Sequence, residues 1–242
     1  MAKLTKKQKK TQEIMADFQQ PASILSAIEM LQKVAKETSK FNETVECHIR
    51  LGLDVKHADQ QVRGTATLPA GLGKVVRVAV IAKGAKLTEA EQAGADIFGT
   101  EDLIEKIQGG FLEFDKVIAT PDCMGMLGKV AKKLGPRGLM PNPKTGTVTL
   151  NIAQAVTEAK SGKVVEFRAI KQPMIQVPIG KIQFTAEDLM KNFATLAETI
   201  IKLKPSSAKG TYIRSIYLTT TMGPSIKLNT KDITNEIKDY LV

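Results

Sequence analysis

Residues 75–82, with the sequence Val75-Val-Arg-Val-Ala-Val-Ile-Ala82, form a near-continuous apolar run rich in β-branched side chains. Such a run is typical of a strand that is covered on both faces of a sheet. Helical and extended patterns then alternate along the chain, with a helix over 87–95, a strand over 96–98, a helix over 101–108, a strand over 115–120 and a helix over 123–134. This alternation predicts a small parallel sheet with helices on both faces and right-handed crossovers.

The segments on either side of this region have an α+β pattern instead. Before it, apolar residues recur at helical spacing over 23–38, and apolar and polar residues alternate over 45–53, which predicts a helix and then a strand. After a further helix over 151–161, the strands predicted over 163–169 and 174–180 form a hairpin, a capping-box pattern opens a helix at Thr185, and a strand covers 212–221. The α+β pattern therefore brackets the α/β region.

Glycine and proline interrupt these patterns over 60–74 and 135–146, which predicts loops. The first loop marks a domain boundary or hinge. With 242 residues the chain is long enough for one or two domains. We therefore predict a two-domain α/β protein: a discontinuous α+β domain from residues 1–71 and 163–242, with a parallel-sheet α/β domain inserted over 72–162.

The chain has 35 Lys and Arg residues against 25 Asp and Glu residues, a formal net charge of +10, and an isoelectric point near 9.5. A strongly basic balance indicates a polyanionic partner, and nucleic acid is the first candidate. With 8 Phe, 3 Tyr and no Trp, the chain has few residues on which bases can stack. Recognition of backbone and shape fits this composition better.

The positive charge is concentrated in three windows that lack carboxylates. The first window is the start of the chain (Lys3, Lys6, Lys7, Lys9 and Lys10), the second lies between Asp122 and Glu158 (Lys129, Lys132, Lys133, Arg137 and Lys144), and the third lies between Glu198 and Asp232 (Lys202, Lys204, Lys209, Arg214, Lys227 and Lys231). Phosphate contacts are expected in such windows. The alternative is that each window is a solvated face.

The segment Thr219-Thr-Thr-Met-Gly-Pro-Ser225 ends the last predicted strand, and alternation places Ser215, Tyr217, Thr219 and Thr221 on one face. Exposed hydroxyls there would serve phosphate and ribose 2′-OH groups, and Gly223 would let an RNA backbone approach closely. The alternative is a plain strand end with a turn. Phe41, before the strand over 45–53, either stacks on a base or fills the core, and the core is the commoner outcome.

Patterns for catalysis are weak. His48 and His57 are the only histidines, and neither belongs to a nucleophile, base and orienting-residue set. The run Gly71-Leu-Gly73-Lys74 fails as a phosphate loop, because it precedes a strand and lacks the first glycine and the final Ser or Thr. A small α/β enzyme or nucleotide-binding protein with an anionic substrate is the alternative to an RNA-binding protein.

Cys47 and Cys123 are 76 residues apart without a CxxC motif, which favours a reducing cytosol over a zinc site or a disulfide framework. The longest stretch without charge, residues 145–157, is shorter than the roughly 20 residues that a membrane span needs. The basic start is followed by a polar segment over 11–17 and is therefore predicted to be a basic arm rather than a signal peptide.

Several strings resemble the family of ribosomal large-subunit protein one, the RNA-binding protein of the mobile stalk. They are Lys40-Phe-Asn-Glu-Thr-Val-Glu46, Leu51-Gly-Leu-Asp54, Asp59-Gln-Gln-Val-Arg-Gly64, Leu68-Pro-Ala-Gly-Leu-Gly-Lys74, Leu134-Gly-Pro-Arg-Gly-Leu-Met-Pro-Asn-Pro-Lys144, Ala208-Lys-Gly-Thr211 and Thr219-Thr-Thr-Met-Gly-Pro-Ser225. The resemblance implies a terminal RNA-binding domain with a Rossmann-like insert and a hinge. It also implies a cytoplasmic, non-catalytic protein of the large subunit without cofactor, metal, small-molecule substrate or membrane.

The implied function is to bind large-subunit rRNA at the stalk near the exit site, to assist release of deacylated tRNA, and to repress translation of its own operon mRNA. The expected RNA-binding residues are Lys40, Phe41, Thr44, Glu46, Arg168, Lys209, Ser215, Tyr217, Thr219, Thr221, Met222, Gly223, Pro224 and Ser225, with secondary basic contacts from Lys3, Lys6, Lys7, Lys132, Lys133, Arg137 and Lys144.

Two regions differ from the family's pattern. The family's Asn-Asp-Lys turn and its histidine are replaced by Ala169-Ile-Lys171 and Gln176. Beyond the family's core, Ile233, Ile237 and Leu241 recur at near-helical spacing within 229–242, and we expect this extension to pack on the domain or to reach a neighbour.

Overall fold

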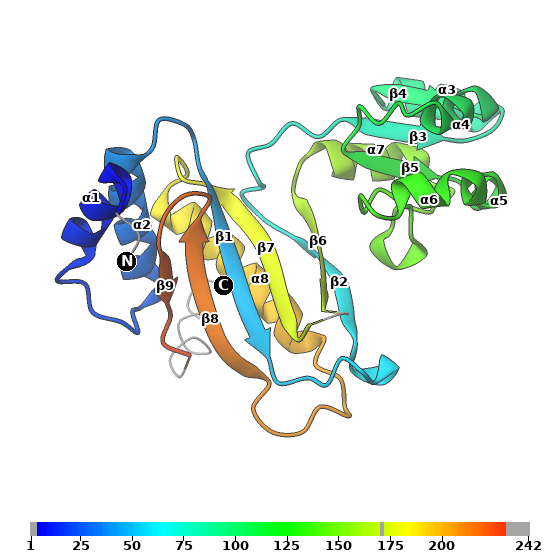
Figure 1. Cartoon of the computed structure of the whole chain (residues 1–242). Coiled ribbons are helices and arrows are strands. Elements are labelled where there is room, and N and C mark those ends of the chain that lie inside the picture. The colour runs from blue at the N-terminus through cyan, green and yellow to red at the C-terminus, as the bar shows by residue number, and fades with distance from the viewer. Residues whose placement is uncertain (1–3, 170–171, 231–242) are drawn as a thin grey trace. The chain divides into compact units, whose positions relative to one another are not determined.

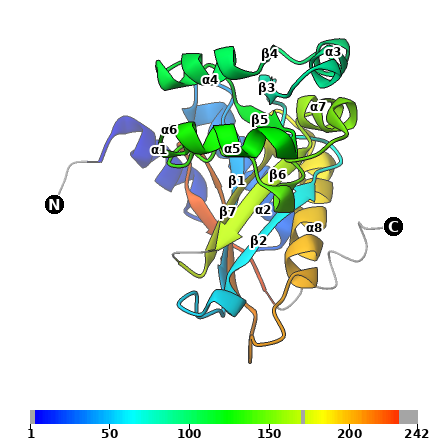
Figure 2. The ribbon, with the colours of Figure 1, turned by 90° about the vertical axis from the view of Figure 1, so that its right-hand side faces the viewer.

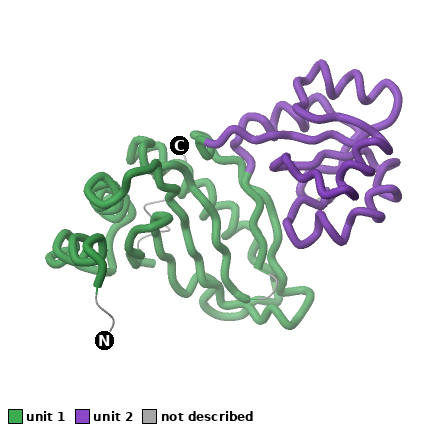
Figure 3. The backbone as a smooth tube through the Cα atoms, turned by 45° about the horizontal axis from the view of Figure 1, so that its top comes forward, with its two compact units in different colours: residues 1–73, 165–242 green, residues 74–164 purple. Residues whose placement is uncertain are grey.

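The computed structural model describes residues 4–169 and 172–230, which form two compact units, each with its own core (Figures 1 and 3). Unit 1 draws on residues 1–73 and 165–242, and unit 2 on residues 74–164. The chain therefore passes between the units twice, at 73–74 and at 164–165. The mixed α/β fold class expected from the sequence is confirmed.

The main sheet of unit 1 has the strand order β7-β1-β8-β9, formed by β7 (Met174–Lys181), β1 (Thr44–Leu51), β8 (Ile213–Thr220) and β9 (Ser225–Lys227). Its neighbouring strands are antiparallel. One face packs against α2 (Ile24–Thr38) and α8 (Ala186–Lys202), as Figures 1 and 2 show. The alternation in β1 and β8 leaves the opposite face partly open to water.

Side-chain caps fix where the helices of unit 1 begin. The Ser23 hydroxyl accepts a hydrogen bond from the Ser26 amide at 3.4 Å, and the Thr185 hydroxyl accepts one from the Asp188 amide at 3.1 Å. The basic start, predicted only as an arm, forms the helix α1 (Lys6–Met15), because Thr5 and Gln8 make a reciprocal capping box.

Two expectations for unit 1 are wrong. Residues 62–67, predicted as loop, form the strand β2 (Val62–Thr67) after a short 3₁₀ turn, η1 (Ala58–Gln60). The strand β6 (Val164–Ala169) pairs with β2, whereas β7 pairs with β1, so the hairpin predicted over 163–180 does not form. Pairing with β2 lets β6 bury Phe167 in the unit 1 core, and Gly64 of β2 leaves room for that ring.

Unit 2 contains the predicted parallel sheet, with the order β4-β3-β5. Its strands are β3 (Val78–Ile81), β4 (Ile97–Gly99) and β5 (Lys116–Ala119). The helices α3 (Ala85–Gln92) and α7 (Ile152–Lys160) cover one face, and α4 (Glu101–Gln108), α5 (Met124–Leu127) and α6 (Ala131–Leu134) cover the other. All four residues of β3 are buried, as expected for the central strand.

The continuous helix predicted over 123–134 is also wrong. The segment is divided into η2 (Pro121–Cys123), α5, η3 (Gly128–Val130) and α6. Glycine is unfavourable in a helix interior, and Gly125 and Gly128 lie in this segment. The extension over 229–242 falls largely outside the described residues. Among the residues that the structure describes, we find no helix with the length and apolar character needed to cross a bilayer.

Candidate nucleic-acid interface

A row of polar side chains lies on the open face of the main sheet of unit 1. The register of β1 and β8 places Glu46 opposite Thr219, His48 opposite Tyr217 and Arg50 opposite Ser215. Ser215, Tyr217 and Thr219 are partly exposed, whereas the intervening Ile216 and Leu218 are buried. The structure therefore brings Glu46, Ser215, Tyr217 and Thr219 together on one face.

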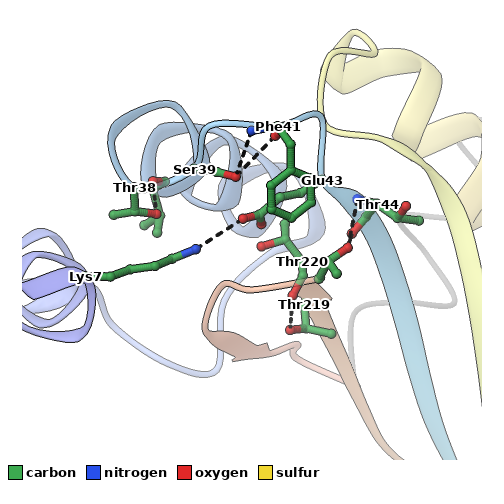
Figure 4. A network of polar contacts seen from close by, with 10 residues as sticks. Lys7, Thr38, Ser39, Phe41, Glu43, Thr44, Thr219 and Thr220 are labelled. Atoms are coloured by element: carbon green, nitrogen blue, oxygen red, sulfur yellow. Dashed lines mark hydrogen bonds and ion pairs between the residues drawn. The ribbon is translucent and has the colours of Figure 1, made fainter. Parts of the chain in front are cut away.

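The start of β1 and the end of β8 are joined by hydrogen bonds between residues 177 positions apart (Figure 4). The Thr44 amide donates to Thr221 Oγ1 at 3.0 Å, and the Thr221 amide donates to the Thr44 carbonyl at 3.1 Å. Lys181 Nζ, at the end of β7, donates to Thr44 Oγ1 at 2.8 Å. Thr221 is one residue beyond β8 and is exposed. The two Thr side chains therefore lie side by side at one end of β1 and β8, the two central strands of the sheet.

Two large apolar side chains are exposed near these strand ends. Phe41 is 55% exposed and Met222 is 59% exposed. The core position that the sequence favoured for Phe41 is therefore wrong. The Ser39 hydroxyl holds the Phe41 backbone, donating to its carbonyl at 3.2 Å (Figure 4). The ring is therefore free to stack on a base.

The turn after β8 brings its backbone to the surface. The Gly223 amide donates to the Thr220 carbonyl at 3.1 Å, and a Cβ at Gly223 would clash with the Thr220 hydroxyl. A side chain at this position would therefore force the Thr220 hydroxyl to move. Pro224 is half-buried in the turn, and Ser225 begins β9 opposite Thr219. We call the group of Phe41, Thr44, Thr219, Thr221, Met222 and Gly223 the strand-end surface.

A buried carboxylate beside this surface was missed by the sequence analysis. Glu43 is completely buried, and Lys7 of α1 approaches its Oε1 at 3.3 Å. Burial would raise the pKa of Glu43, but contacts with Thr220, Ser39 and Lys7 outweigh it and hold the pKa below its ordinary value. An acidic residue in a loop before a strand ordinarily faces water, so no pattern in the sequence indicates this burial.

The remaining candidates of unit 1 do not all lie near these strand ends. Lys40 is exposed beside Phe41. Lys209 precedes the other end of β8, and Arg168 lies on β6, in the two-stranded sheet. Lys6 is exposed on α1, and Lys3 lies outside the described residues.

Unit 2 carries the other basic candidates. Lys132 and Lys133 lie on α6, Arg137 follows it, and all three are exposed. Lys133 Nζ also donates to the Gln108 carbonyl. The backbone of Lys144 lies in the 3₁₀ turn η4 (Pro143–Thr145). These residues form a second basic segment. It belongs to unit 2, whereas the strand-end surface belongs to unit 1.

The side chains of His48 and Cys123 each lie beside one polar side chain. His48 Nε2 lies 3.5 Å from the Glu46 carboxylate, and the buried Cys123 accepts a hydrogen bond from the Thr120 hydroxyl at 3.3 Å. Across 4–169 and 172–230, we find no cluster of three His, Cys, Asp or Glu residues arranged to hold a metal ion.

The chain is a basic α/β protein, and it presents hydroxyl groups and an exposed aromatic ring at the ends of two neighbouring strands. These are features of a nucleic-acid-binding protein. The model of the Ribosomal protein L1p/L10e family matches residues 31–224, and the chain belongs to this family. It is therefore a ribosomal protein of the large subunit that binds rRNA, located in the cytoplasm within that subunit. The family consists of structural ribosomal proteins, which agrees with the non-enzymatic role expected from the sequence.

Proposed function

We propose that the chain binds its rRNA mainly through the strand-end surface of unit 1. The observation that carries this proposal is the meeting of Thr44 and Thr221, from opposite ends of the chain, beside exposed Phe41 and Met222. Threonine hydroxyls and backbone groups match phosphate oxygens and ribose 2′-OH groups, and Gly223 permits close approach of an RNA backbone. Glu46, Ser215 and Tyr217 extend the surface along the open face of the sheet.

Basic residues supply the part of the affinity that does not depend on sequence. Lys40 lies next to Phe41 of the strand-end surface. In this proposal the secondary phosphate contacts come from Lys3 and Lys6 at the start of the chain and from Lys132, Lys133, Arg137 and Lys144 of unit 2. Each phosphate contact releases counterions, so the salt dependence of binding reports the number of such contacts. Lys209 and Arg168 lie elsewhere on unit 1, where they contact the part of the RNA that extends beyond the strand-end surface.

We infer the biological setting from the resemblance to the ribosomal protein family. The RNA is the stalk rRNA near the exit site, and the two passages of chain between the units serve as a hinge. Motion about this hinge assists release of deacylated tRNA. An mRNA that mimics the rRNA site is bound by the same surface, which represses translation of the protein's own operon.

The strand-end surface is tested by substituting its exposed side chains. We expect Thr221→Ala and Met222→Ala each to raise the Kd for a stalk rRNA fragment about tenfold, as expected for a lost contact worth about 1.4 kcal/mol. Filter binding at several salt concentrations measures both Kd and the number of phosphate contacts. Thermal melting should change little for Met222→Ala, because that side chain is exposed, and the protein should stay folded with Thr221→Ala, which loses the hydrogen bond from the Thr44 amide.

The matched control is Thr67→Ala, an exposed threonine on β2 that lies outside the strand-end surface. It should leave the Kd unchanged. If Thr221→Ala and Met222→Ala unfold the protein, or if they bind RNA as the wild type does, the strand-end surface is not the main RNA site. A wild-type Kd that is insensitive to salt would exclude phosphate recognition altogether.

A further inference from the structure

Glu43 is the one buried carboxylate among the residues that the structure describes. A buried charge is costly unless it is paired or hydrogen-bonded. Its position is fixed by the backbone as well, because the Ile182 amide donates to the Glu43 carbonyl at 3.0 Å. The protein therefore maintains a charged group in its interior at the start of β1.

The carboxylate lies beside Thr220, the residue that precedes Thr221 and Met222 (Figure 4). Thr220, the last residue of β8, is buried and contributes to the lowered pKa of Glu43. A Cβ built at Gly223 would lie 3.8 Å from Glu43 Oε2, which places the carboxylate against the turn after β8. A change in the position or charge of Glu43 would therefore act on the strand-end surface directly.

The cation that compensates Glu43 comes from outside the region matched by the family model. Lys7 lies on α1, whereas the match begins at residue 31. Lys7 is 29% exposed, and its Nζ lies 3.3 Å from Glu43 Oε1. None of the residues of α1 is fully buried. A second ion pair, between Lys10 Nζ and Glu37 Oε2 at 3.3 Å, also joins α1 to α2. Polar contacts therefore have a large share in holding α1 in place.

We propose that Lys7 and Glu43 are positioning residues that hold the 220–223 turn in its RNA-binding conformation, and that Lys7 does so without contacting RNA. This inference rests on the proposed RNA site, and it differs from the expectation that Lys7 is a phosphate contact. Loss of Lys7 leaves the carboxylate buried without its cation. The carboxylate then moves toward water or gains a proton, and in either case the packing beneath Thr221 and Met222 changes.

The full-length chain provides the test, with a stalk rRNA fragment as the probe. We expect Lys7→Met to raise the Kd about tenfold while the slope of log Kd against log salt stays at the wild-type value. Lys7→Arg should restore most of the affinity, because it keeps the charge near Glu43. Lys33→Met removes an exposed charge on α2 that lies outside the basic windows and the proposed contacts, so it serves as the matched control and should leave the Kd and the slope unchanged.

Glu43→Gln tests the same contact from the other side. Because each substitution breaks the same ion pair, the double variant Lys7→Met with Glu43→Gln should bind RNA no more weakly than Lys7→Met alone. Additive losses would show that the two residues act independently and would overturn the proposal. Lys7→Met is the decisive variant, since Lys7 is partly exposed and its substitution is compatible with folding.

Two further results would overturn the inference. The first is a slope for Lys7→Met that is smaller by about 0.7 to 0.9, which would make Lys7 a phosphate contact. The second is a Lys7→Met variant that binds as the wild type does while Thr221→Ala still weakens binding. The proposed function is tested separately, because normal binding by Thr221→Ala and Met222→Ala would contradict it whatever Lys7→Met does, so the two failures are distinguishable.

Discussion

Asn192 is a buried polar side chain that connects α8 to two other segments of unit 1. It lies within α8, and its side-chain oxygen accepts from the Ala70 amide at 3.0 Å. Its side-chain nitrogen donates to the carbonyls of Gly71 and Ile179 at 2.9 and 2.7 Å. Asn192 therefore fastens α8 and β7 to the segment that leads toward unit 2, and it satisfies three backbone groups that are removed from water.

The first prediction at this scale concerns the loss of that amide. Asn192→Leu keeps a similar volume but leaves the three backbone groups without their partner, so we expect it to reduce the free energy of unfolding by about 3 kcal/mol. Urea denaturation followed by circular dichroism measures the change. Lys191→Leu, at the exposed neighbouring position, should stay within about 0.5 kcal/mol of the wild type. An equally small effect of Asn192→Leu would contradict this account.

Sequence patterns predict burial well within a strand and poorly within a loop. The alternation over 212–221 correctly separates Ser215, Tyr217 and Thr219 from the buried Ile216 and Leu218. For the loop before β1, the general preference of Phe for the core favoured a buried Phe41 and nothing singled out Glu43, whereas Phe41 is exposed and Glu43 is buried. A loop residue is placed by contacts with distant segments, and here those contacts come from α1 and from the turn after β8.

At the scale of elements, β3 shows both what the apolar run predicts and what it leaves open. The strand is buried on both faces, as the run indicates, but it is shorter than the run. Carboxylates fix the segment where β3 begins: Asp96 accepts from the Val78 amide at 2.9 Å, and Asp115 accepts from the Arg77 amide at 3.2 Å. Val75, in contrast, is 88% exposed.

The ion pairs of Asp115 predict an acid-sensitive contribution to the stability of unit 2. Hydrogen bonding with Lys74 and Arg77 lowers the pKa of Asp115 below its ordinary value of 3.8. A lowered pKa stabilises the folded state above the ordinary value, and the contribution is lost as the pH falls through the folded value. Since the pair is partly exposed, we expect a contribution of about 0.5 kcal/mol.

Asp115→Asn should therefore lower the thermal stability slightly at pH 7 and reduce the loss of stability between about pH 4 and pH 2. Thermal melting across this pH range provides the measurement. Asp122→Asn removes an exposed carboxylate from the same unit and is the control. If Asp115→Asn and the wild type lose stability in parallel on acidification, the ion pairs with Asp115 do not stabilise the fold.

Strand pairing is the part of the fold that local patterns predict least well. Both segments of the expected hairpin are strands, but β6 pairs with β2 and β7 pairs with β1. The β2 segment contains glycine and polar residues and has no strand pattern of its own, and β9 is only three residues long. The pairing of such strands depends on how their side chains pack against distant segments of the chain, which a local pattern does not show.

At the scale of the whole molecule, the two units have separate cores and separate basic segments. The main sheet and the helices α2 and α8 that cover it come from both ends of the chain, and unit 2 is inserted between them. The sequence predicts this organisation because the hydrophobic pattern changes twice, from α+β to α/β and back. It does not predict how α1 contributes to unit 1, because the contact between Lys7 and Glu43 joins residues 36 positions apart.

The most direct measurement of the central claim is the affinity of unit 1 alone for the stalk rRNA fragment. In this variant residues 74–164 are replaced by a short flexible linker, and circular dichroism verifies that the remaining chain is folded. The account predicts that its Kd stays within about tenfold of the full-length value at the same salt concentration, since only secondary phosphate contacts are removed. A folded variant that no longer binds the fragment would contradict the account and would move the main RNA site to unit 2.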